Sequence, residues 1–127
     1  GRYVDDIDLP AQLEVAFLRS PHASARIVSI NVDHAREARG VELVLTGHDL
    51  GELNAPLPAF VPDPNMTAPH TQLPLATERV RYVGEAIAMV VAADRYLAED
   101  AAALIEVEYD VLPAVVELAD AANGRRA

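Results

Sequence analysis

The chain has 127 residues, which is enough for one hydrophobic core and therefore for one domain. Its 20 acidic and 10 basic residues give a net charge of −10, so a polyanionic partner such as nucleic acid is excluded by repulsion. The absence of cysteine excludes disulfides, thiolate metal ligands and a cysteine nucleophile, and it agrees with a reducing compartment.

No segment of the sequence has the length of a membrane span. The longest apolar run covers residues 86–93 and ends at Asp94, whereas a transmembrane helix needs roughly 18 or more apolar residues. Residues 1–6 lack the basic and then apolar order of a secretion signal. We therefore expect a cytoplasmic protein without a membrane partner.

Alternating apolar residues predict two strands near the N-terminus. Leu13, Val15 and Phe17 recur at a period of two, which predicts a strand with these three side chains on its core face. A turn at residues 20–22 follows. The next strand covers residues 28–32, with its apolar positions 28, 30 and 32 facing inward.

A short helix and a third strand come next. Asp33 is predicted to cap a helix over residues 34–39, and Gly40 to end it in a left-handed conformation. Residues 41–45 alternate as a strand, which a turn at residues 46–49 closes.

The segment 52–74 differs in composition from the rest of the chain. It holds six of the nine prolines and shows no sustained hydrophobic period, which predicts a long loop. A loop of more than about 15 residues in a compact domain is usually functional, disordered or in contact with a neighbour. Because prolines lower the entropy cost of ordering a segment on a partner, we predict that this loop is a docking surface.

A central strand is predicted after the loop. Val80 and Tyr82 begin a strand that Gly84 interrupts, and residues 87–91 are apolar on both faces. Such a run is typical of a strand that is covered on each side.

An amphipathic helix is predicted over residues 95–104. Asp94 is placed to cap it, and Leu97, Ala101 and Leu104 form its apolar stripe, which Ala98 and Ala102 widen.

The order of these elements indicates the fold class. Residues 105–109 alternate as a strand, and a last apolar stretch covers residues 114–116. Strand, helix and strand at this spacing indicate an α+β (mixed α/β) fold with a small mixed sheet, one long helix and one short helix. We expect a single domain over residues 1–122, which includes loop 52–74, and a tail over residues 123–127.

The polar residues give no self-sufficient catalytic set. The histidines at positions 22, 34, 48 and 70 lack partners at metal-ligand spacing, so we interpret them as solvated turn residues. Ser20 and Ser24 flank the first of them, but a triad is assembled in space and needs an orienting acid. Glu106 and Glu108 share one face of a strand and are interpreted as solvent-facing rather than as a catalytic pair.

Glu85 lies at the start of the longest apolar run. A carboxylate beside a dry strand can have a raised pKa and act as a base. Gly84 indicates instead a sharp turn that leads the chain into the sheet, with the glutamate remaining in water. We therefore predict no catalytic, cofactor-binding or metal-binding residue in this chain.

Four segments carry a resemblance to a known family. They are GRYVDDI, FLRSPHASARI, VLTGHDL and VRYVGEAIAMVVAADRYLAEDAAALIEVEYDVLPAVV. In order and spacing they resemble the N-terminal domain of molybdenum hydroxylase large subunits: xanthine dehydrogenase, aldehyde oxidase and aerobic carbon monoxide dehydrogenase. The similarity covers residues 1–122. Ser24 and Ala86 depart from residues that are frequent in the family.

The resemblance implies an α/β-hammerhead fold and a place in an oxidoreductase. In these enzymes a molybdopterin cofactor hydroxylates the substrate with oxygen from water, and electrons leave through iron–sulfur clusters and FAD. The resemblance places these groups, and the catalytic residues, on other domains or subunits. It therefore implies molybdenum cofactor domains, in the same or a companion chain, and iron–sulfur and flavin subunits as partners, and it implies that this chain alone is inactive.

A second hypothesis has no redox role. The same fold can serve as a stand-alone interaction module, since a fold does not determine a function. Genes for molybdopterin-binding, flavin and iron–sulfur subunits beside this one would favour the enzyme hypothesis.

Overall fold

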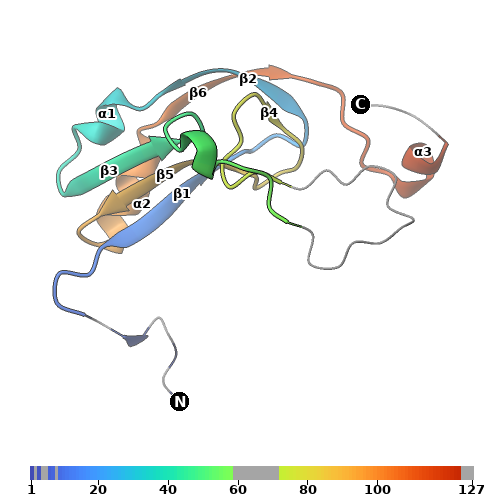
Figure 1. The fold of residues 1–127 in the computed structure, drawn as a ribbon. Coiled ribbons are helices and arrows are strands. Elements are labelled where there is room, and N and C mark those ends of the chain that lie inside the picture. Colours follow the sequence, from blue (N-terminus) through green and yellow to red (C-terminus); the bar gives the residue numbers. More distant parts are fainter. Residues whose placement is uncertain (2, 4–5, 8, 59–71, 124–127) are drawn as a thin grey trace.

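The computed structural model describes residues 1, 3, 6–7, 9–58 and 72–123. Two three-stranded sheets form the domain (Figure 1). The first has the order β1-β5-β3 and the second β4-β2-β6, and all pairs are antiparallel. The strands are β1 (Glu14–Arg19), β2 (Ala25–Asn31), β3 (Val41–Thr46), β4 (Arg79–Val80), β5 (Ala86–Ala92) and β6 (Glu106–Val111). The helices are α1 (Asp33–Arg36), the 3₁₀ turn η2 (Gly51–Leu53), α2 (Arg95–Ala103) and α3 (Leu118–Ala122).

Strand β5 is the central strand of the first sheet, as predicted. Its residues Ala88, Val90 and Ala92 are fully buried. Helix α2 contacts all three strands of this sheet, and its residues Ala101 and Ala102 belong to the same core cluster as Ala88 and Val90. The mixed α/β fold class is therefore confirmed, although it is built from two small sheets.

The prediction for the core face of β1 is wrong. Leu13, Val15 and Phe17 are between 44% and 47% exposed, whereas Ala16 and Leu18 pack against the core. Both faces of this strand are apolar, so the period of two is compatible with either orientation. The helix lies against the face with Ala16, and the larger side chains point away from it.

Strand β2 also differs from the prediction, because it contains an irregularity. Its pairing with β6 shifts between Ile27 and Ser29, so Val28 is 57% exposed. Ile30 and Val32 pack in the core as predicted, and Ile27 takes the inward position expected for Val28. An extra residue in one strand changes the face on which later side chains lie.

Helix α2 begins where the sequence predicts. The backbone N–H of Leu97 donates to a carboxylate oxygen of Asp94 at 2.9 Å, which is an N-cap. Ala98, Ala101 and Ala102 of the predicted stripe are buried, whereas Leu104 at its end is 46% exposed. Small side chains on the inner face let the helix lie close to the sheet.

Helix α1 has a different start from the predicted one. Its N-cap residue is Val32, without a side-chain cap, so Asp33 does not cap it. The side-chain oxygen of Asn31 accepts a hydrogen bond from the Asp33 backbone N–H at 3.0 Å. Gly40 does adopt the predicted left-handed conformation, with φ +76°.

Gly40 and Gly84 give a matched pair of substitutions. Both have positive φ, but a Cβ at Gly40 would approach Leu97 Cδ1 to 2.6 Å, whereas a Cβ at Gly84 meets nothing within 4 Å. We expect Gly84→Ala to cost about 1 kcal/mol for backbone strain and Gly40→Ala somewhat more, because the Leu97 methyl group must also move. Denaturant unfolding of both variants measures the difference, and equal losses would contradict the steric argument.

The turn at residues 46–49 forms as predicted. A carboxylate oxygen of Asp49 accepts hydrogen bonds from the backbone N–H of Thr46 at 2.8 Å and from its hydroxyl at 2.7 Å. The Arg36 guanidinium lies 3.6 Å away. The hydrogen bonds from Thr46, helped by the charge of Arg36, lower the pKa of Asp49 below its ordinary value of 3.8.

This pKa shift predicts an acid-dependent loss of stability. A carboxyl with a lowered pKa in the folded state stabilises the fold above its unfolded pKa, and this contribution is lost as the pH falls through the folded pKa. Between pH 5 and pH 3 we therefore expect the free energy of unfolding to fall more for wild type than for Asp49→Asn. Parallel curves for the two proteins would contradict the assignment.

A second core cluster joins the two sheets. Its buried residues are Ala25, Ala76, Val80 and Ile87. Strand β4 is shorter than predicted and ends before Tyr82. Residues 114–116 form no strand, and α3 follows them without a sequence signal.

Candidate functional site

Arg19 and Ser20 are hydrogen-bonded to the Gly84–Glu85 turn. The guanidinium of Arg19 donates to the Gly84 carbonyl at 2.9 Å. The backbone N–H of Ser20 donates to the Glu85 carbonyl at 2.9 Å, and that of Gly84 to the Ser20 carbonyl at 2.8 Å. Gly84 has φ +91°, so the predicted role of this glycine as a turn residue is confirmed.

Glu85 has a structural role but not the predicted surroundings. It is only 3% exposed, so the prediction that it remains in water is wrong. A carboxylate oxygen of Glu85 accepts a hydrogen bond from the backbone N–H of Arg81 at 2.5 Å. The carboxylate is buried because it closes the turn between residues 81 and 85.

His22 packs against an aromatic ring. Its ring lies edge-on to that of Tyr109, with centroids 4.8 Å apart and an interplanar angle of 72°. The Ser20 hydroxyl donates to the His22 carbonyl and accepts from the His22 N–H, both at 3.0 Å. Burial raises the pKa of Tyr109. These bonds fix the turn, and no orienting acid is hydrogen-bonded to His22 among the described residues.

The other histidines and the carboxylate pair predicted from the sequence do not form a site among the described residues. His34 and His48 are exposed, and His70 lies outside the described residues. Within the described part of the chain, no three His, Asp or Glu side chains are grouped so that they could hold a metal ion. Glu106 and Glu108 are exposed, as predicted, and Glu108 accepts a hydrogen bond from the Ser29 hydroxyl at 3.3 Å.

The proline-rich loop can be followed only at its two ends. Residues 59–71, at the centre of the predicted docking loop, lie outside the described residues. The Asn54 side chain donates to the Leu75 carbonyl at 2.9 Å and accepts from the Leu75 N–H at 3.0 Å. Leu57 N–H donates to the Gln72 carbonyl at 3.1 Å. These bonds hold the two ends of the loop together.

The sheet β1-β5-β3 has a second apolar face, opposite α2. Directly paired residues lie on the same face of a sheet. The register therefore gives two rows, which we call the outer face: Val15, Val91 and Leu43 in one row, and Phe17, Met89 and Leu45 in the other.

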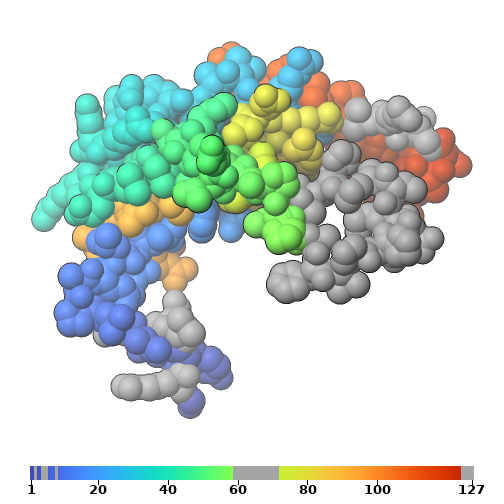
Figure 2. All heavy atoms as spheres, in the orientation of Figure 1, coloured from blue at the N-terminus to red at the C-terminus, as the bar shows by residue number. Residues whose placement is uncertain are grey.

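The outer face is only partly covered by the described residues. Val15 and Leu43 are each 47% exposed and Phe17 is 44% exposed, while Leu45, Met89 and Val91 are half-buried. Strand β1 lies at the rim of the folded body (Figure 2). The apolar run over residues 87–91 predicts that both faces of this sheet are covered. Among the described residues, only the face toward α2 is covered, which leaves the outer face as an exposed apolar surface.

No helix among the described residues combines the length and apolar character needed to cross a bilayer.

Comparisons with known proteins identify relatives over most of the chain. Residues 1–113 match the family described as aldehyde oxidase and xanthine dehydrogenase, a/b hammerhead domain. The carbon monoxide dehydrogenase large chain of Afipia carboxidovorans is 44% identical over 92% of this chain and 14% of its own length. The nicotine 6-hydroxylase large subunit of Paenarthrobacter nicotinovorans is 39% identical over 92% of this chain and 14% of its own length.

A solved structure has the same fold. Quinoline 2-oxidoreductase from Pseudomonas putida 86 superposes with a TM-score of 0.91 and 47% identity, over 99% of this chain and 16% of that chain. The Cu,Mo-CO dehydrogenase superposes with a TM-score of 0.84 and 43% identity. The chain thus spans about a seventh of the length of the curated relatives above.

Proposed function

Because this chain belongs to the aldehyde oxidase and xanthine dehydrogenase hammerhead family, we propose that it serves as a supporting domain of a molybdenum hydroxylase large subunit. In this proposal the domain packs against the molybdenum cofactor domains and takes no chemical part in the reaction. The complete enzyme is an oxidoreductase that uses molybdopterin, with iron–sulfur clusters and flavin on partner domains or subunits. The relatives named as carbon monoxide dehydrogenase and nicotine 6-hydroxylase favour this class.

The single observation that carries the proposal is the outer face. A sheet in a monomeric domain normally has one apolar and one polar face. Here both faces are apolar, and Val15, Phe17 and Leu43 remain nearly half exposed. A contiguous exposed apolar surface indicates an interaction site, and the relatives contain about six times more chain to cover it.

The described residues offer no site for an iron–sulfur cluster. An iron–sulfur cluster is held mainly by cysteine thiolates. The chain has no cysteine, and the described portion contains no group of three potential metal ligands. In this proposal the iron–sulfur clusters are therefore bound by other domains or subunits.

Metal analysis tests this proposal. We expect molybdenum to copurify with the complete protein that contains this chain, and the 127-residue chain alone to contain no molybdenum and to show no turnover. Turnover by the isolated chain would contradict the supporting role. A complete protein that is free of molybdenum would favour a stand-alone interaction module.

A further inference from the structure

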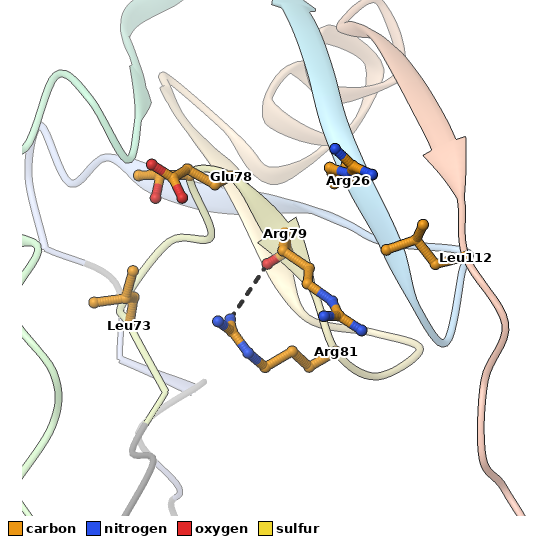
Figure 3. A pocket seen from close by; sticks show the side chains of 7 residues that line it. Arg26, Leu73, Glu78, Arg79, Arg81 and Leu112 are labelled. Atoms are coloured by element: carbon orange, nitrogen blue, oxygen red, sulfur yellow. Dashed lines mark hydrogen bonds between the residues drawn. The ribbon is translucent and has the colours of Figure 1, made fainter. Parts of the chain in front are cut away.

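Three of the ten basic residues gather at one pocket of the β4-β2-β6 sheet. Arg26 comes from β2 and Arg79 from β4, and Arg81 follows β4 directly (Figure 3). Leu73 and Leu112 form apolar parts of the wall. The pocket has a volume of about 470 Å³.

The positive charges of this arginine pocket are poorly compensated. Arg26 and Arg79 are paired directly across the two strands, and like charges in that position destabilise a sheet. Arg26 has an exposed ion pair with Asp110 at 3.6 Å. Among the described residues, neither Arg79 nor Arg81 forms an ion pair with a carboxylate. Glu78 borders the pocket, but Figure 3 shows its carboxylate pointing away from the Arg79 guanidinium.

One donor of the pocket is buried without an acceptor. The Nε–H of Arg79 has no hydrogen-bond partner in the described structure. The same guanidinium donates through Nη2 to the Ser24 hydroxyl at 3.0 Å, which holds it in place. Arg81 donates through Nη1 to the Arg79 carbonyl at 3.4 Å. A guanidinium has five donors, and a buried donor without a partner indicates a missing acceptor.

We propose that the arginine pocket binds an oxyanion, a carboxylate or phosphate group that accepts from Arg79 and Arg81. The planar fork of a guanidinium matches both groups, and charge-assisted hydrogen bonds are the strongest available to them. Leu73 and Leu112 suit an anion that is carried on a carbon stem. This site lies in a different sheet from the outer face, so it does not depend on the proposed function.

The structure of the complete protein, determined in phosphate buffer, tests the occupant directly. We expect an oxygen of a carboxylate or of phosphate within hydrogen-bonding distance of the Arg79 or Arg81 guanidinium. Density that continues into an Asp or Glu side chain identifies a protein carboxylate, and isolated density identifies a free anion. Only water, or an apolar side chain, at this position would overturn the proposal.

Two variants test whether the arginines provide the binding energy. Arg81→Gln removes a pocket charge, and Arg39→Gln removes an equal charge from an exposed residue that does not line the pocket. For a free anion, the inorganic phosphate concentration that gives half of the thermal stabilisation should rise at least about tenfold in Arg81→Gln and stay unchanged in Arg39→Gln.

For a protein carboxylate, Arg81→Gln should lower the unfolding temperature in the absence of phosphate, and Arg39→Gln should not. For both kinds of occupant, an equal effect of Arg81→Gln and Arg39→Gln would mean that only the net charge of the chain matters. That result would overturn the proposal. Molybdenum content and turnover are separate readouts, so failure of this proposal is distinguishable from failure of the proposed function.

Discussion

Val15→Asp is expected to reduce assembly of the complete large subunit by at least about tenfold. Burying a valine on the outer face contributes roughly 1.5 kcal/mol or more to the interface, and an aspartate in its place brings an unpaired charge into an apolar contact. Val15 pairs directly with Val91 in the row that ends at Leu43. Molybdenum content and turnover per purified protein measure the loss.

Val28→Asp is the matched control. Val28 is a strand residue with a 57% exposed side chain, but it belongs to the other sheet. We expect this variant to keep molybdenum content and turnover within about twofold of wild type, as exposed substitutions usually do. Leu43→Asp, on the opposite edge strand of the outer face, should reproduce the loss. The interface assignment is wrong if Val28→Asp is as damaging as the other two.

Ile87→Ala is expected to cost about 2–5 kcal/mol in the free energy of unfolding. Ile87 is fully buried and packs with Ala25, Ala76 and Val80 in the cluster that joins the two sheets. Removing three carbon atoms leaves a cavity that the surrounding strands fill only in part. Denaturant unfolding measures the loss.

Val111→Ala controls for the loss of a branched side chain from a strand. Val111 is 60% exposed in β6, so we expect a change within about 0.5 kcal/mol. If Ile87→Ala were equally mild, the two sheets would not share a rigid core.

Sequence periodicity predicted the strands well but not the faces that they bury. Elements β1, β3, β5 and α2 begin within a residue or two of their predicted positions. The orientation of β1 was wrong because Ala16 and Leu18 compete with Val15 and Phe17 for the core. Which face is buried depends on where α2 packs, and that is a tertiary contact without a local signal.

In the candidate site, too, local features could be predicted from the sequence and tertiary contacts could not. The role of Gly84 was predictable, because only a residue without Cβ adopts φ +91° without strain. The burial of Glu85 was not, since it depends on a hydrogen bond to the Arg81 backbone. The arginine pocket was missed because Arg26 is 53 residues from Arg79 in sequence and becomes its neighbour only through the pairing of β2 with β4.

The most direct measurement of the central claim is the solvent exposure of the outer face in an experimental structure of the complete protein. Val15, Phe17 and Leu43, now nearly half exposed, should each become buried against side chains of another domain. If these three side chains kept their present exposure in the complete protein, the domain would not support its neighbours through this sheet.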